Sequence, residues 1–191
     1  MKKITLFLLL FVSPFIFSQD DEEEKDEVSN HKTELGLDGF ANASSFGGSF
    51  GVGAKYGVIK NKNIIFGPSL RLQRSWSNYY GQKYGFTIFG GGAFVHYRLK
   101  NSLFVGAELE VLKCPTYYNN VYSIKRWVPT CFVGGGFSHE FVNIGFRLNA
   151  GVFYDVISNP SSPFFTSYIL KKENGTPVPL IYRIGFFFPL N

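Results

Sequence analysis

The sequence predicts an all-β fold, an eight-stranded antiparallel up-and-down transmembrane β-barrel, and three observations indicate it. About ten residues of alternating apolar and polar or glycine positions recur eight times after an apolar leader. These segments are ended alternately by a tight turn and a longer loop. Charged residues make up 17% of the chain against about 25% in ordinary soluble domains, while aromatic residues reach 18% and glycines number 21. This composition favours a barrel in lipid.

The leader sets the compartment. Residues 1–18 contain Lys2 and Lys3, then an apolar run, then the small residue Ser18. This order is typical of a secretory signal peptide. Ser13 and Pro14 interrupt the apolar run, which is shorter than the roughly 20 residues of a transmembrane helix. We therefore expect cleavage after Ser18 and export of the chain.

Charge divides the remaining chain into two regions. Residues 19–32 carry seven acidic residues against Lys25 and Lys32, which predicts an acidic, disordered periplasmic tail. The tail is either a solvated spacer or a docking strip for a basic periplasmic partner. Residues 33–191, the predicted barrel, carry 15 Lys and Arg against 7 Asp and Glu, a net charge of +8.

The alternation places the strands in order along the chain. The expected ranges are 33–43, 49–59, 64–75, 84–99, 103–114, 127–139, 143–156 and 179–190. Tight turns are expected at 60–63, 100–102 and 140–142, and longer loops at 76–83, 115–126 and 157–178. Because bacterial outer-membrane barrels have short periplasmic turns and longer outer loops, both termini are expected in the periplasm.

Three glycine runs give a weak internal repeat. Residues 47–48, 90–92 and 134–136 each open a stretch that ends in a tight turn and a returning strand. Glycines inside strands mark bulges or close backbone approach. The alternation of strand 84–99 changes parity across 90–92, which predicts a shift there, and 134–136 is a second place where the register can shift. No helix is expected after any of these runs, so a phosphate-binding loop is disfavoured.

The two faces of the strands differ in content. One face is uncharged, while the other carries five acids and five bases separated by glycines. In an eight-stranded barrel the side chains just fill the interior, so we expect this face to form a paired lumen charge network. A soluble barrel would also alternate, but its surface would carry more charge and more Lys. The predicted network residues are Glu34, Asp38, Lys55, Arg71, Arg98, Glu108, Glu110, Arg147, Asp155 and Arg183.

Basic residues interleaved with tyrosines gather in or beside the predicted outer loops. Cations at the headgroup level attract phosphate. These side chains either recognise an anionic glycolipid or surface polymer, or form a solvated rim that suits an anionic leaflet. The predicted outer-loop anion contacts are Arg74, Lys83, Lys125, Arg126, Lys171 and Lys172.

Chemistry-bearing residues are few. Cys114 and Cys131 flank a predicted loop in an oxidising compartment, and a disulfide between them requires both Cβ atoms on one face about 4 Å apart, which the sequence leaves open. The segment 138–140 (Ser-His-Glu) and His96 lie towards the inferred periplasmic end, away from where lipid A acyl chains would lie. The histidines and cysteines lack metal-ligand spacing. We expect no catalytic residue, no metal and no cofactor.

The final segment, 182–191, resembles the aromatic carboxy-terminal strand by which outer-membrane barrels engage their assembly machinery, although it does not end in Phe. From 33 to 191 the chain resembles the small eight-stranded outer-membrane β-barrel proteins of the OmpA and OmpX type. The resemblance implies insertion by the barrel-assembly machinery of a Gram-negative outer membrane and association with outer-membrane lipids and lipopolysaccharide.

The functional expectation is a non-enzymatic integral outer-membrane protein with a structural or surface-interaction role. One alternative is a narrow pore for small solutes, in which the lumen charges form a selectivity lining. The other is an accessory subunit of a larger outer-membrane complex with a protein partner. Nucleic acid is not an expected partner.

Overall fold

The computed structural model describes residues 32–44, 47–61, 63–79, 82–99, 102–118, 121–159, 161–164, 168–173 and 176–190. Within these ranges only the backbone is described for residues 43, 44, 47, 77–79, 82–84, 115–118, 121–125, 171 and 177. The predicted signal peptide and all of the predicted acidic tail except Lys32 lie outside the described residues.

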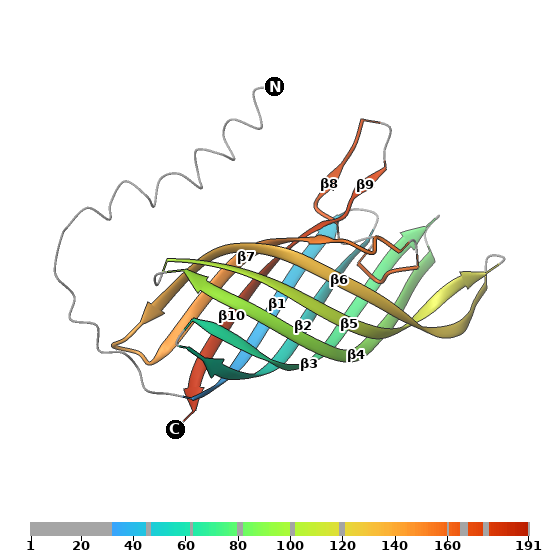
Figure 1. The fold of residues 1–191 in the computed structure, drawn as a ribbon. Coiled ribbons are helices and arrows are strands. Elements are labelled where there is room, and N and C mark those ends of the chain that lie inside the picture. Colours follow the sequence, from blue (N-terminus) through green and yellow to red (C-terminus); the bar gives the residue numbers. More distant parts are fainter. Residues whose placement is uncertain are drawn as a thin grey trace. The chain divides into compact units, whose positions relative to one another are not determined.

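The chain folds into a closed antiparallel barrel (Figure 1), which confirms the predicted fold class. Each strand pairs with the next along the chain, and β1 pairs with β10 to close the barrel. No helix long and apolar enough to cross a membrane occurs among the described residues. The barrel strands are β1 (Thr33–Ser44), β2 (Gly47–Lys60), β3 (Ile64–Tyr79), β4 (Gln82–Leu99), β5 (Leu103–Tyr118), β6 (Val121–Phe141), β7 (Phe146–Asp155) and β10 (Leu180–Leu190).

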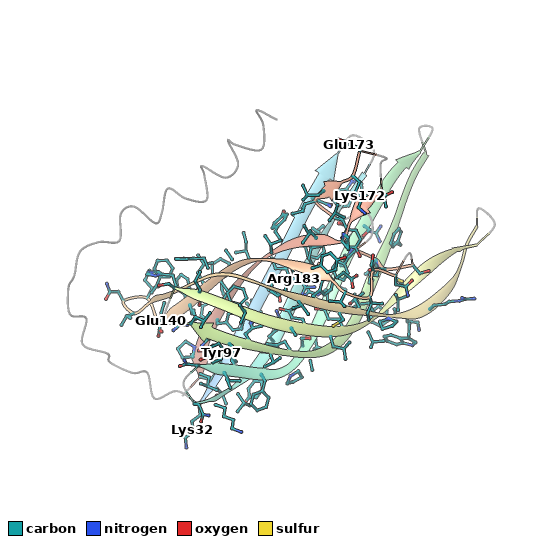
Figure 2. The ribbon with its side chains drawn as sticks, turned by 45° about the horizontal axis from the view of Figure 1, so that its top comes forward. Lys32, Tyr97, Glu140, Lys172, Glu173 and Arg183 are labelled. Atoms are coloured by element: carbon teal, nitrogen blue, oxygen red, sulfur yellow. The ribbon has the colours of Figure 1, made fainter. Side chains whose placement is uncertain are left out.

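The two ends of the barrel differ. At one end, here called the turn end, lie both described chain ends and the short connections from β2 to β3, from β4 to β5 and from β6 to β7. At the other, the loop end, residues 156–179 connect β7 to β10 and contain a short hairpin of β8 (Leu170–Lys171) and β9 (Pro177–Val178). Figure 2 shows Lys32, Tyr97 and Glu140 towards the turn end, Lys172 and Glu173 at the hairpin, and Arg183 between them.

Strand boundaries differ from the prediction mainly at the loop end. β3 pairs with β4 as far as Tyr79 with Gln82, and β5 pairs with β6 as far as Tyr118 with Val121. The predicted loops 76–83 and 115–126 are therefore mostly strand, because their tyrosine-rich sequences continue the backbone ladder. The predicted turn 140–142 lies at 142–145 instead, where Gly145 adopts a positive φ of 73°.

Side chains alternate strictly across the sheet. In β5, Glu108, Glu110 and Leu112 are buried inside, while Leu109 and Val111 are exposed on the outside. The same alternation along the other barrel strands leaves large apolar side chains exposed on the outer face. Among the strand side chains described, the charged ones on that face are Lys60, Arg74 and Lys113. The outer face is therefore an apolar band that carries no described acidic side chain.

The predicted change of parity at Gly90–Gly92 is wrong. Ile88 and Phe94 both point inward, and the pairing of β4 with β3 and β5 runs through the glycines without a shift. The register is also continuous through 134–136. The glycines instead permit close backbone approach, since a Cβ atom at Gly92 would lie 1.8 Å from the carbonyl oxygen of Leu109.

The barrel interior is filled by apolar as well as charged side chains. A cluster of three buried residues lies towards the turn end: Ile65, Phe94 and Phe187. A larger cluster extends to the loop end and comprises Phe40, Ile88, Phe104, Leu112, Cys114, Val128, Phe132, Phe153, Phe164, Tyr168 and Ile181. The prediction of a charged lumen omitted this apolar filling.

Candidate functional site

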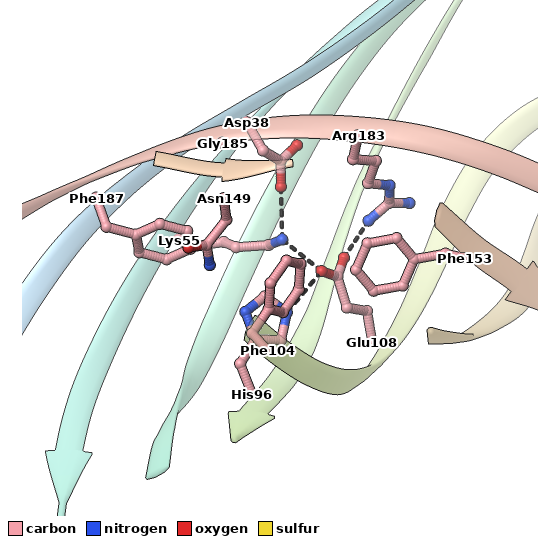
Figure 3. Close-up of a pocket in the computed structure, with 10 residues that line it drawn as sticks. All are labelled: Asp38, Lys55, His96, Phe104, Glu108, Asn149, Phe153, Arg183, Gly185 and Phe187. Carbon is pink, nitrogen blue, oxygen red and sulfur yellow. Dashed lines mark hydrogen bonds and ion pairs between the residues drawn. The ribbon is translucent and has the colours of Figure 1, made fainter. Parts of the chain in front are cut away.

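A chain of alternating charges crosses the middle of the barrel interior. Lys55 Nζ lies 2.6 Å from a carboxylate oxygen of Asp38 and 2.6 Å from one of Glu108. Glu108 also contacts Arg183, and its Oε1 lies at hydrogen-bond distance, 2.9 Å, from His96 Nε2 (Figure 3). Three cations and three carboxylates alternate here, and we name them the central charge cluster: Asp38, Lys55, Arg71, Glu108, Glu110 and Arg183.

Arg71 links the two halves of this cluster. Its guanidinium lies 2.9 Å from Asp38 and 2.8 Å from Glu110, and Arg183 lies 3.1 Å from the same Glu110 carboxylate. Every member of the cluster is at least 94% buried. Removing charges from water is costly unless each is paired and hydrogen-bonded, so the equal numbers of both signs are a requirement of the site.

Aromatic rings pack directly on the cations. The Arg183 guanidinium lies 4.5 Å from the ring centroid of Phe132, and Lys55 Nζ lies 5.4 Å from that of Phe94. Such contacts add electrostatic attraction to the apolar packing. The charged and apolar parts of the lumen therefore form one packed interior.

Three of the predicted lumen residues make pairs outside the central cluster. Arg98 forms a bidentate ion pair with Glu34 near the turn end. Arg147 pairs with Glu140, a residue that was predicted to lie in a turn. The Glu140 side chain is 30% exposed, so this pair lies at the rim of the lumen.

Asp155 is the predicted network residue that has a different role. Its carboxylate accepts hydrogen bonds from the backbone N–H groups of Ile157 and Ser158, each at 3.2 Å, and from the Tyr168 hydroxyl at 2.8 Å. Burial and the bond to this carboxylate raise the pKa of Tyr168 above its ordinary value, which keeps the hydroxyl a donor. Asp155 thus anchors the connection 156–179 instead of balancing a lumen cation.

Residues 162–164 of that connection fold back into the lumen at the loop end. Phe164 is fully buried, 4.9 Å edge-on from Phe132 and 5.5 Å from Phe40. Gln73 Nε2 donates to the Pro163 carbonyl at 3.2 Å, and Cys114 Sγ donates to the Ser161 carbonyl at 3.4 Å. The connection is therefore a plug held by both apolar and polar contacts.

Little space remains beside the central cluster. The cavity in Figure 3, lined by Lys55, His96, Asn149 and their neighbours, has a volume of about 10 Å³. This is roughly the room that one water molecule needs. At the level of the central charge cluster, the described side chains therefore leave room for about one water molecule.

The predicted outer-loop contacts are spread over the loop end. Arg74 lies on the outer face of β3 and donates to Thr87 Oγ1 at 2.9 Å. Arg126 in β6 and Lys172 beside β8 are also exposed. The side chains of Lys83, Lys125 and Lys171 lie outside the described residues. The described contacts thus belong to three separate elements at one end of the barrel.

The disulfide that the sequence left open is not formed. Cys114 and Cys131 are both free thiols. Cys114 is buried inside the barrel opposite Arg126, whereas Cys131 faces outward opposite Leu109. A disulfide needs both Cβ atoms close together on one face, and these two cysteines lie on opposite faces at different levels.

The serine and histidine that adjoin in the sequence are also separated by the sheet. Ser138 is buried and hydrogen-bonds to Asn149 Oδ1 at 2.8 Å, while His139 lies outside between the rings of Phe137 and Phe141. This placement does not make a nucleophile and base pair. Within the described ranges, no group of three or more His, Cys, Asp or Glu side chains is placed to hold a metal ion.

Comparison with known proteins gives a likeness to solved structures. No protein-family model matches the chain, and no curated protein matches it. Among solved structures, the Yersinia pestis outer membrane protein Ail in a phospholipid bilayer nanodisc is similar, with 12% sequence identity and a TM-score of 0.45 over 84% of this chain and 99% of that one. In its own strand order and closure, this chain is a closed eight-stranded antiparallel barrel, the architecture that the sequence predicted.

Proposed function

We propose that this chain is a non-enzymatic integral outer-membrane barrel with a closed lumen and a structural or surface-interaction role. The observation that carries the proposal is the inverted distribution of side chains, charged pairs inside and large apolar residues outside. A water-soluble barrel would gain by exposing those charges and burying those apolar residues. Lipid is the solvent that stabilises the opposite arrangement.

The height of the apolar outer band supports this location. On β5 the outward residues from Leu103 to Val111 are apolar, and Lys113 follows them. The ten steps from Leu103 to Lys113, at about 3.3 Å each and inclined at about 40°, rise roughly 25 Å, which is the height of the apolar band in outer-membrane barrels. Trp127 lies at the edge of this band nearer the loop end, and Tyr97 lies near the edge at the turn end, as expected for rings at the two membrane interfaces.

Membrane insertion is tested by gel mobility. We expect the detergent-folded protein to resist SDS at room temperature and to change mobility after boiling. A protein that is soluble without detergent and is released from membranes by carbonate would contradict the proposal.

The closed lumen separates this function from the pore alternative. Because the central cluster, the apolar clusters and the Phe164 plug fill the interior, planar-bilayer recordings should give little steady conductance. Reproducible large openings from pure protein would favour the narrow pore. Tightly paired lumen charges would then have to separate to admit solute.

The surface role that the loop end supports best is contact with lipopolysaccharide, with the turn end and both termini in the periplasm. Arg126 and Lys172 are exposed at the loop end, and cations at the headgroup level of a membrane bind phosphate. Changing Lys125 and Arg126 to Ala should weaken salt-sensitive lipopolysaccharide binding. Lys60→Ala, at the turn end, is the matched control. Equal binding by the double variant at low salt would remove this segment as the contact.

A second candidate is an accessory subunit of a larger envelope complex. The turn between β6 and β7 exposes two apolar side chains, Val142 at 65% and Ile144 at 70%. Exposed apolar groups beyond the strands suit contact with a partner. This candidate predicts that a fixed partner co-purifies with the protein. The double variant Val142→Ser/Ile144→Ser should lose the partner, and Lys60→Ala should keep it. Purification of the unchanged protein without a partner would count against this candidate.

A further inference from the structure

A cation lies between two rings on the outer face near the loop end. Phe89, Lys113 and Trp127 are direct register partners on β4, β5 and β6, and we name them the Lys113 row. Lys113 Nζ is 6.0 Å from the Phe89 ring centroid and 5.7 Å from that of Trp127, while the two rings meet edge-on at 6.2 Å. The rings hold the ammonium group at the surface, where Trp127 is 57% exposed.

An apolar groove lies on the same three strands, closer to the turn end. Ala93, Leu109 and Cys131 are again register partners, four residues further along each strand, which is about 13 Å from the Lys113 row. Together with Val95 and Ala107 they line a groove of about 280 Å³ on the outer face. The small side chains of Ala93, Ala107 and Cys131 leave this space within an otherwise bulky band.

A second cation flanks the Lys113 row. Arg74 on β3 pairs with Thr87 on β4, one outward step above Phe89. Arg74 is two strands away from Lys113 and two residues further along the strand direction. At about 4.8 Å per strand and 3.3 Å per residue, their backbones lie about 12 Å apart. Neither cation pairs with a carboxylate among the described residues, and the outer strand faces carry no described acid.

We propose that this surface binds the lipid moiety of lipopolysaccharide, with its phosphates at Lys113 and Arg74 and one acyl chain in the groove. The assignment rests on the proposed membrane location and names a site that the loops do not contain. Two separated cations match a headgroup that carries two phosphates, because a lysine ammonium or an arginine guanidinium each binds one anion. The groove lies below the headgroup level, where an acyl chain runs.

A second copy of this chain is the less favourable occupant. Symmetric dimers bury the same surface from both subunits. A dimer through this surface would bring Lys113 and Arg74 of each copy into an interface without the acidic partners that like charges require. An anionic lipid neutralises both cations.

Trp127 provides the measurement, since the chain has two tryptophans and Trp76→Phe leaves Trp127 alone. The variant is reconstituted in phosphatidylcholine brominated on its acyl chains, which quenches Trp127. Unbrominated lipid A, phosphatidylglycerol or phosphatidylcholine is then added, and relief of quenching gives the relative binding constant. We expect lipid A to relieve quenching far beyond its mole fraction, ahead of the other two lipids.

Variants in the same background test the contacts. Each basic residue near an anionic surface contributes about 1 kcal/mol, so Lys113→Gln and Arg74→Gln should each lower the lipid A preference about fivefold. Lys60→Gln, an outward lysine at the turn end, should leave it unchanged. Ala107→Leu fills the groove and should also lower it. The heat-dependent gel shift confirms that each variant is folded.

Several outcomes would overturn the assignment. If lipid A relieves the quenching of Trp127 no better than phosphatidylcholine, there is no specific lipid site at this surface. If phosphatidylglycerol relieves it as well as lipid A, the site binds anionic lipids in general and not the glycolipid. If Lys113→Gln keeps the full preference for lipid A, the Lys113 row does not bind its phosphate. Efficient Cys131 to Cys131 crosslinking between barrels, unaffected by lipid A, assigns the surface to a dimer. A chain that fails to insert overturns both this site and the proposed function, whereas normal insertion without lipid A preference overturns the site alone.

Discussion

Glu108→Gln is the substitution that most sharply tests the central charge cluster. The Glu108 carboxylate contacts Lys55 at 2.6 Å, His96 at 2.9 Å and the Arg183 guanidinium, and its side chain is 1% exposed. Glutamine keeps the shape but removes one of three negative charges that balance three positive ones. Its amide also turns a donor towards groups that are themselves donors.

The size of the effect follows from this burial. Removing one partner of a buried ion pair costs about 3–5 kcal/mol, because the remaining charge is left uncompensated. Arg147→Gln should cost less, about 1 kcal/mol or below, since its partner Glu140 is 30% exposed and surface pairs contribute little. The double change Lys55→Met/Glu108→Gln restores charge balance and should recover about 0.5–3 kcal/mol of the sum of the two single effects.

The assay is reversible urea unfolding in lipid vesicles, followed by tryptophan fluorescence and by the heat-dependent gel shift. Glu173→Gln, in the exposed loop end, is the control and should stay within about 0.5 kcal/mol of the unchanged protein. If Glu108→Gln were as stable as that control, Glu108 would have to lie in water, and the paired interior described above would be refuted.

Three other expectations concern the plug, the glycines and the thiols. Phe164→Ala should release the connection 156–179 to protease while the barrel keeps its gel shift, because the ring anchors the plug and not the sheet; an unchanged cleavage rate would argue against docking. Gly92→Val should abolish the folded band, since its Cβ would lie 1.8 Å from a carbonyl oxygen, whereas Ala93→Val on the open outer face should fold; equal folding of both would contradict the close approach. Mass spectrometry of non-reduced protein should find free thiols at Cys114 and Cys131, and a bridged species would refute their placement on opposite faces.

Much of the fold could be predicted because period-two alternation reports which face a residue occupies. Alternation alone put ten charged residues on one face, and the structure places all ten side chains inside the barrel. Alternation does not assign partners across the lumen, because those depend on the shear between distant strands. Arg147 pairs with Glu140, its direct register partner on the adjacent strand, which was missed because the turn was predicted too early, and Asp155 anchors a loop.

The plug and the strand ends could not be read in the same way. The connection 156–179 has no periodicity, so nothing in the sequence distinguishes the inserted Phe164 from an exposed loop aromatic. The tyrosine-rich segments 76–83 and 115–126 resemble loops in composition, yet a backbone ladder forms through most of each. The parity shift was mispredicted, and the pairing of the two cysteines was left open, because glycine runs permit close approach without a bulge.

The central claim is that the outer face meets lipid and the charged face is sealed inside, and methyl NMR in lipid nanodiscs tests it most directly. Val111 and Leu112 are neighbours on β5, the first 40% exposed outside and the second fully buried inside. A nitroxide on the lipid acyl chains should broaden the methyl signals of Val111, Leu109 and Leu70 and leave those of Leu112 and Ile88 sharp. A water-soluble paramagnet should leave all of these signals sharp. Broadening of Leu112 and Ile88 by that paramagnet, with Val111 unaffected by the lipid nitroxide, would contradict the account.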